Sequence, residues 1–373
     1  MVLKILVATR KGLFTLARNG SGASPWQIER TDFLADNVSL VLHDARSGRL
    51  YAALDHGHFG VKLHTRDGDS APWRELPAPV YPEKPADAPD KDMWGNPLPW
   101  STVRVWALET GAPSQDGVIW CGTIPGGLFR SVDHGESWSM IDSLWRHPKR
   151  QHWMGGGADL PGLHSICVDP RDPATIRVAV STGGVWETSD SGATWHNDNT
   201  GMWQDHAPEE SRLDPNGQDA HRLVQCRAKP DRMWIQHHNG IFRSDDSGKT
   251  WNECLNVSPS SFGFAVAVHP NEPDTAWFIP EIKDERRIPA NDRLVVTRTR
   301  DGGKTFEVLS NGLPQEPTFD IVYRHALDVD SSGEALAMGS TTGGVWISEN
   351  QGDNWTFAAG RFPPVYAVRF MET

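Results

Sequence analysis

The chain is built from short runs of apolar and β-branched residues that are separated by turn-forming residues. Between residues 164 and 198 four such runs follow one another: HSICVD, TIRVAVS, GVWETS and TWHND. Each run has the length of a β-strand and is bounded by Gly, Pro or Asp. The pattern predicts a unit of four antiparallel strands that are joined in chain order as a meander.

This unit recurs along the chain, and a repeated motif, S/T-x-D-x-G-x-x-W/F, joins its third and fourth strands. Good copies begin at Ser131, Thr188, Ser244, Thr299 and Ser348, and a degraded copy begins at Thr65. Successive good copies start 57, 56, 55 and 49 residues apart. Four-stranded units that repeat at about fifty residues are typical of the blades of a β-propeller.

The two ends of the chain complete one further unit. ILVAT (5–9) and GLFTL (12–16) have the character of second and third strands, and VYAVRF (365–370) has that of a first strand. Building one blade from both ends removes exposed sheet edges, which invite aggregation. The sequence therefore predicts an all-β fold, a seven-bladed propeller of four-stranded antiparallel blades in a single domain, 1–373. In the closing blade, residues 364–370 should pair beside residues 3–9.

Composition and charge exclude several classes of partner. The chain has 36 Lys and Arg against 48 Asp and Glu, a formal net charge of −12, and no basic run. Because such a chain repels phosphate groups, we expect neither nucleic acid nor a membrane as a partner. The start, MVLKILVATRKG, is too short in apolar residues for a secretory signal, and the four cysteines show no CxxC spacing. We expect a cytoplasmic protein, and the oligomeric state stays open.

The repeated motif resembles the Asp-box, or BNR, repeat of a family of β-propellers that includes sialidase-like bacterial proteins. The resemblance extends over the whole chain and implies the propeller fold. It implies little about activity, because a propeller is a scaffold that carries many functions.

The aspartates of the motif are predicted to be structural; they are Asp133, Asp190, Asp246 and Asp301. A carboxylate at this position accepts hydrogen bonds from turn amides, while the glycine takes a positive φ and the aromatic residue packs between sheets. The turn between the third and fourth strands lies on the face opposite the blade-to-blade connections. The longest connections, 80–102, 139–163 and 196–220, are candidates for binding loops, so we expect function on their face.

Aligning the blades places equivalent residues around the mouth of the central channel on that face. At the start of the inner strands the equivalent residues are Ser39, Ala107, His164, His221, Phe264 and Arg324. Before the third strands they are Arg10, His58, Pro125, Thr182, His238 and Thr342. His164, His221 and His238 are expected to converge, with Glu281 from the next blade. The three imidazoles, with Glu281 as a further carboxylate ligand, can hold one divalent metal ion such as zinc, iron or manganese. Alternatively, a histidine that Glu281 orients can serve as a metal-free acid/base pair.

Other residues at this mouth are candidates for binding a substrate. Arg10, Arg104 and Arg324 can hold a carboxylate or another anion. His58 is the blade-two equivalent of His238, and Trp153 can stack on a sugar or an aromatic ring.

Two classes of function fit these residues. The first is an enzyme, a hydrolase or lyase that acts on a small polar or anionic molecule, such as a sugar or a lactone, at the histidine-lined mouth. The second is a non-catalytic module that docks a peptide or protein on the same face. Titratable residues that share a concave site favour the enzyme. A sialidase-type glycoside hydrolase is a weaker alternative, because Arg287, Ile288 and Pro289 spell the Arg-Ile-Pro of sialidases but follow most of the repeats.

Overall fold

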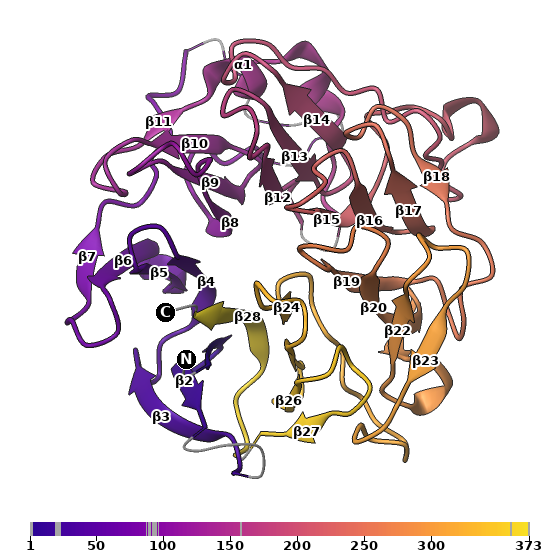
Figure 1. The fold of residues 1–373 in the computed structure, drawn as a ribbon. Helices are drawn as coiled ribbons and strands as arrows, with labels where there is room; N and C mark the ends of the chain where they lie inside the picture. The colour runs from indigo at the N-terminus through magenta and orange to yellow at the C-terminus, as the bar shows by residue number, and fades with distance from the viewer. Residues whose placement is uncertain are drawn as a thin grey trace.

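The computed structural model describes residues 3–18, 24–86, 88, 91, 95, 97–156, 159–358 and 360–371. These residues form seven antiparallel sheets around a central channel, and the chain passes from blade to blade in order around the ring (Figure 1). The prediction of a seven-bladed, all-β propeller is confirmed.

Within each blade the strands follow one another from the channel outward, and the blades are numbered along the chain. Blade one contains β28 (Val365–Met371), β1 (Lys4–Thr9), β2 (Gly12–Ala17) and β3 (Gln27–Asp32). Blade two contains β4 (Val38–Asp44), β5 (Arg49–Asp55), β6 (Val61–Asp67) and β7 (Arg74–Leu76). Blade three contains β8 (Arg104–Thr110), β9 (Ile119–Ile124), β10 (Leu128–Ser131) and β11 (Ser139–Met140). Blade four contains β12 (Leu163–Val168), β13 (Ile176–Val180) and β14 (Gly184–Thr188).

Blade five contains β15 (Ala220–Gln225), β16 (Met233–His237), β17 (Gly240–Ser244) and β18 (Asn252–Glu253). Blade six contains β19 (Gly263–Val268), β20 (Ala276–Lys283), β22 (Val296–Thr299) and β23 (Glu307–Leu309), and β21 (Arg286–Pro289) pairs with β20. Blade seven contains β24 (Leu327–Val329), β25 (Leu336–Gly339), β26 (Val345–Ser348) and β27 (Thr356–Phe357).

The helical segments are short and lie in loops. They are η1 (Gly57–Phe59), α1 (Asp142–Trp145), η2 (Pro148–His152), η3 (Glu209–Ser211) and η4 (Ala290–Asp292). Among the described residues, no helix has the length and apolar character needed to cross a membrane.

The two ends of the chain close the ring in blade one. β28 pairs antiparallel with β1, from Lys4 opposite Met371 to Thr9 opposite Val365. The labelled N- and C-termini accordingly lie near each other (Figure 1). The predicted pairing of residues 364–370 beside residues 3–9 is confirmed.

Tryptophan fills the space between neighbouring blades. Trp120, Trp186, Trp234 and Trp277 are completely buried, one in each of blades three to six. They belong to apolar clusters whose members come from adjacent blades. Because each indole removes a large apolar area from water, the high tryptophan content follows from the packing of the ring.

Blade four departs from the predicted four strands. The run TWHND forms only an isolated bridge between Glu187 and His196. The Asn199 side chain accepts a hydrogen bond from the backbone N–H of Val185 at 2.9 Å and donates one to the carbonyl of Pro215 at 3.2 Å. This amide takes the place of a backbone partner and directs the chain away from the sheet edge.

The repeated motif has the predicted local structure. The Asp133 carboxylate accepts hydrogen bonds from the Ser137 amide at 2.9 Å and the Ser131 hydroxyl at 2.7 Å, and Asp190 makes the same bonds with Thr194 and Thr188. The glycines that follow have φ near +90°, a conformation that glycine adopts without strain. These carboxylates are engaged within their own turns.

Candidate active site

A β-bulge at the start of the inner strands adds one residue at the channel mouth. The pairing register shifts there in six blades, and the extra residues are Ser39, Trp106, His164, His221, Phe264 with Ala265, and Tyr366. Bulges re-aim side chains and often occur beside active sites. The predicted equivalence is wrong in blade three, where Ala107 pairs with Gly122 and Trp106 takes the bulge. Arg324 precedes β24 instead of lying within it.

Asp219, immediately before β15, is in contact with two of the predicted histidines. Its Oδ2 lies 3.5 Å from Nδ1 of His238, and its Oδ1 lies 3.9 Å from Nε2 of His221. One ligand atom from each of the three residues lies within 4.8 Å of the other two. Asp219 is buried, and its Oδ1 has no hydrogen-bond partner among the described residues. Burial works to raise the pKa of Asp219, but the neighbouring histidines lower it below its usual range, so the carboxyl is ionised.

His221 is held as a neutral imidazole. Its Nδ1 lies 2.7 Å from the carbonyl oxygen of Gly263, so Nδ1 donates and the lone pair of Nε2 faces Asp219. The ring stacks on Phe264 with a centroid distance of 4.6 Å. Burial lowers the pKa of His221 to about 4, although Asp219 acts in the opposite direction.

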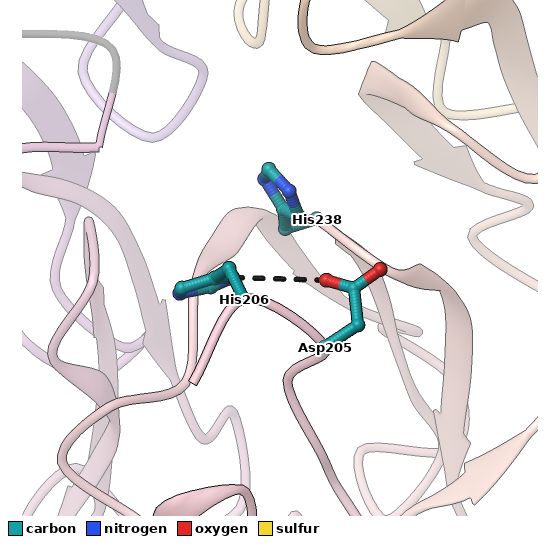
Figure 2. Close-up of side chains that lie close together, drawn as sticks. All are labelled: Asp205, His206 and His238. Atoms are coloured by element: carbon teal, nitrogen blue, oxygen red, sulfur yellow. Dashed lines mark ion pairs between the residues drawn. The ribbon is translucent and has the colours of Figure 1, made fainter. Parts of the chain in front are cut away.

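His238 follows β16 and lies between two acidic groups. Its hydrogen bond to Asp219 raises its pKa, and its Nε2 lies 3.7 Å from Oδ2 of Asp284. Asp205 and His206, from the connection between blades four and five, also approach the His238 ring, and Asp205 pairs with His206 at 3.8 Å (Figure 2). Both of these side chains are exposed to solvent.

Glu281, near the end of β20, is the second buried carboxyl at this mouth. It is 1% exposed, and neither carboxyl oxygen has a hydrogen-bond partner among the described residues. Burial raises the pKa of Glu281 to about 8, although Arg287 and Arg324 act to lower it. Glu281 is therefore protonated at neutral pH.

Arg324 links the two carboxyls electrostatically. Its guanidinium carbon lies 5.1 Å from the ring centroid of Trp106 and 5.2 Å from that of Phe264, and Nη2 donates to the carbonyl of Gly156 at 3.1 Å. Burial lowers its pKa to about 10, so it remains a cation at neutral pH, and its charge acts on both Asp219 and Glu281. Its Nε has no hydrogen-bond partner among the described residues.

His164 lies at the same mouth but outside the group that surrounds Asp219. Its Nδ1 lies 2.9 Å from the Ser165 hydroxyl, and its ring packs on Trp106 at 5.5 Å. Burial holds the pKa of His164 well below its usual range, and its Nε2 has no hydrogen-bond partner in the described part of the chain. Among the described residues, ligand atoms gather within 4.8 Å in two groups, Asp219 with His221 and His238, and Asp205 with His206 and His238, and neither group includes His164.

Three of the predicted binding residues lie on blades one to three. Arg104 pairs with Asp55 at 2.8 Å. Arg10, at the turn between β1 and β2, and His58, in η1, are exposed, and the ring of His58 packs on Phe59. The ring and ion-pair contacts of these described side chains do not include the histidines around Asp219.

Trp153 occupies an interior position. It is 3% exposed, and its ring lies 5.6 Å from that of Trp186 in the cluster between blades three and four. In this position the indole packs blades together and is not available to stack on a ligand.

The sequence interpretation missed Asp219 and Asp284. Asp219 precedes His221 by two residues, and such a spacing at a strand start places both side chains on one side of the chain. That Asp-x-His spacing was the available signal. Asp284 follows the end of β20 and carries no comparable signal.

A cavity of about 460 Å³ lies at the other end of the channel, at the carboxyl ends of the inner strands. Two ion pairs line it, Arg46 with Asp44 at 2.8 Å and Arg369 with Asp328 at 3.1 Å. Nη1 of Arg222 lies 3.1 Å from the His164 carbonyl oxygen and 3.0 Å from Nδ1 of His325. Arg222 thus connects blade five to blades four and seven. The unpartnered buried groups of Asp219, Glu281 and His164 place the candidate site at the mouth instead.

No protein-family model matches the sequence. The chain is 23% identical over 274 residues to a probable oligoxyloglucan-reducing end-specific xyloglucanase of Neosartorya fischeri, an alignment that covers 65% of this chain and 31% of that protein. The chain thus spans about a third of the length of this relative.

Solved structures share the fold at low sequence identity. An ancestral GH74 enzyme superposes with a TM-score of 0.57 at 15% identity, covering 86% of this chain and 38% of that one. A putative 6-phosphogluconolactonase from Bacteroides uniformis superposes with a TM-score of 0.61 at 12% identity, covering 99% of both chains. At these identities the likeness extends to the propeller fold alone.

Proposed function

We propose that the protein is a hydrolase that cleaves a glycosidic bond in a sugar substrate at the channel mouth. The observation that carries this proposal is a pair of buried carboxyls, Asp219 and Glu281, at one mouth beside Arg324. Burial raises the pKa of Glu281 to about 8, whereas the neighbouring histidines lower the pKa of Asp219 below its usual range. Glycosidases need one carboxylic acid to protonate the leaving oxygen and a second, basic group on the other side of the scissile bond. The relative named as a xyloglucanase supports the substrate class.

In this proposal Glu281 donates its proton to the glycosidic oxygen as the bond between that oxygen and the anomeric carbon breaks. A water molecule attacks the anomeric carbon, and the group of Asp219, His221 and His238 takes up the proton that the water loses. The net reaction adds one water across the bond and restores both groups after proton exchange with solvent.

Aromatic and cationic groups at the mouth supply binding. Trp106 is half-buried and presents ring surface next to Arg324, and aromatic faces pack well against the apolar faces of sugars. The buried cation Arg324 lies near the rings of Trp106 and Phe264, and its Nε–H has no partner among the described residues, so a change in its rotamer would let it donate to a sugar oxygen.

The proposal is tested by incubating the purified chain with a panel of xyloglucan oligosaccharides and other β-linked oligosaccharides, and measuring newly formed reducing ends. We expect turnover of at least one member, and no turnover of it by the Glu281→Gln variant. If the panel members bind in a calorimeter but none is cleaved, the hydrolase assignment is wrong and the alternative of a binding module is favoured.

A further inference from the structure

We propose that Asp219, His221 and His238 bind one divalent transition-metal ion. The ligands would be the Asp219 carboxylate, Nε2 of His221 and Nδ1 of His238. Metal binding itself is independent of the proposed function, and only the role of a metal-bound water as the attacking nucleophile rests on it.

The spacing of the donor atoms fits this site. The two donor pairs that include Asp219 are 3.5 and 3.9 Å apart, and the whole set lies within 4.8 Å. Ligand atoms at about 2.1 Å from a tetrahedral ion are about 3.4 Å from one another. The two pairs with Asp219 therefore need to close by about 0.1 and 0.5 Å, and the pair of histidine nitrogens by up to about 1.4 Å, which side-chain rotation can supply.

The surroundings of His221 set the tautomer that a metal requires. Nδ1 of His221 donates to the carbonyl of Gly263 at 2.7 Å, which leaves Nε2 free. Nδ1 of His238 lies 3.5 Å from Asp219, where a metal ion would take the place of its proton, and Nε2 lies 3.7 Å from Asp284. A metal-binding imidazole characteristically donates its other N–H to a carbonyl or a carboxylate, as His221 does to Gly263.

The carboxylate of Asp219 is a second, independent observation that points to a cation. The residue is 6% exposed, and Oδ1 has no hydrogen-bond partner among the described residues although it lies on the side of His221. A buried carboxyl oxygen without a partner is costly, and a cation at the centre of the three donors would satisfy it.

The donor set also indicates the class of ion. Two imidazoles and one carboxylate suit zinc, iron(II) or manganese, whereas magnesium and calcium prefer oxygen ligands. Three protein ligands leave a position for water, as in catalytic zinc sites. A water bound to such an ion loses its proton near neutral pH and becomes a strong nucleophile.

A second group of possible ligands, Asp205, His206 and His238, shares His238 with the proposed site (Figure 2). The side chains of Asp205 and His206 are 59% and 39% exposed. Water can hydrogen-bond to both side chains, so neither Asp205 nor His206 needs an ion to compensate for burial. Because His238 belongs to both groups, variants of the other members distinguish the two sites.

The test uses the full chain, purified without a histidine tag and stripped with EDTA, and titrated calorimetrically with Zn²⁺ and, in parallel, with Mg²⁺. We expect one Zn²⁺ per chain and no saturable Mg²⁺ binding. His221→Ala and Asp219→Asn should each weaken Zn²⁺ binding by about 100-fold or more, and Asp284→Asn by roughly 10-fold. The matched control His206→Ala should stay within about 2-fold of the wild-type affinity.

Circular dichroism and thermal unfolding of each stripped variant show whether the chain is folded, and the half-buried His238→Gln gives a second ligand variant if His221→Ala unfolds. Absence of stoichiometric Zn²⁺ binding by the wild type overturns the proposal, as does loss of binding in His206→Ala with retention in His221→Ala. Hydrolysis that persists in the stripped enzyme refutes the metal-bound nucleophile while leaving the proposed function standing. If the chain binds the metal but hydrolyses no member of the panel, the metal site stands and the proposed function is wrong.

Discussion

The Glu281→Gln variant is expected to lose hydrolytic activity by about 10²–10⁴-fold in kcat/KM, the range that general acid catalysis supplies. Glutamine has nearly the same shape as the protonated glutamic acid, but its amide does not release a proton to a leaving oxygen. The measurement is kcat/KM of the variant against the substrate that the wild type turns over. Glu75→Gln, at an exposed position paired with Lys62, is the matched control and should retain full activity.

The stability of the same variant reports on the protonation of Glu281. The pKa of about 8 in the folded chain lies above the ordinary value of 4.5. Between these values the unfolded chain has released the proton while the folded chain retains it, so this group reduces the free energy of unfolding as the pH rises from about 4.5 to 8. Glu281→Gln removes this effect and should gain stability relative to the wild type across that window. Full activity, or a relative stability that does not change with pH, would contradict the role given to Glu281.

The Asp219→Asn variant is expected to lose activity to a similar extent. The substitution keeps the shape but removes the negative charge that faces His221 and His238, on which proton uptake by this group depends. The measurement is again kcat/KM, with Asp205→Asn, an exposed carboxyl on the neighbouring connection, as control. The Glu281→Gln, Asp219→Asn double variant should lose little beyond either single variant, because residues that act as one unit are strongly non-additive. A double loss equal to the product of the single losses would show that the two carboxyls act separately.

The sequence was sufficient for the fold because each blade repeats one pattern of strands and turns. The copies of the repeated motif and the strand-like runs at the two ends of the chain gave the count of seven blades, and the bonds of Asp133 and Asp190 follow from local turn chemistry. Blade four was the exception, since the Asn199 side chain replaces a backbone partner there. Such a tertiary hydrogen bond leaves no periodic signal.

The site was predicted in part. Blade equivalence was enough to place His164, His221 and His238 at one mouth, although His164 lies outside the group around Asp219. It failed at Ala107, because a bulge shifts the register by one residue and gives the mouth position to Trp106. The binding role predicted for Trp153 rested on its place in a long connection, and there the indole packs between blades. Hydrophobic patterning carries no information on either event.

The protonation state of Glu281 can be observed without a known substrate by infrared difference spectroscopy between pH 6 and pH 10, on the wild type and on Glu281→Gln. A protonated carboxylic acid has a carbonyl band that is distinct from the bands of a carboxylate. If Glu281 is the proton donor at this mouth, the wild type shows such a band at neutral pH, the band disappears with a midpoint near pH 8, and Glu281→Gln lacks it. A wild-type spectrum without a protonated carboxyl at pH 6–7, or a band that persists unchanged in Glu281→Gln, would contradict the assignment of Glu281 as the acid.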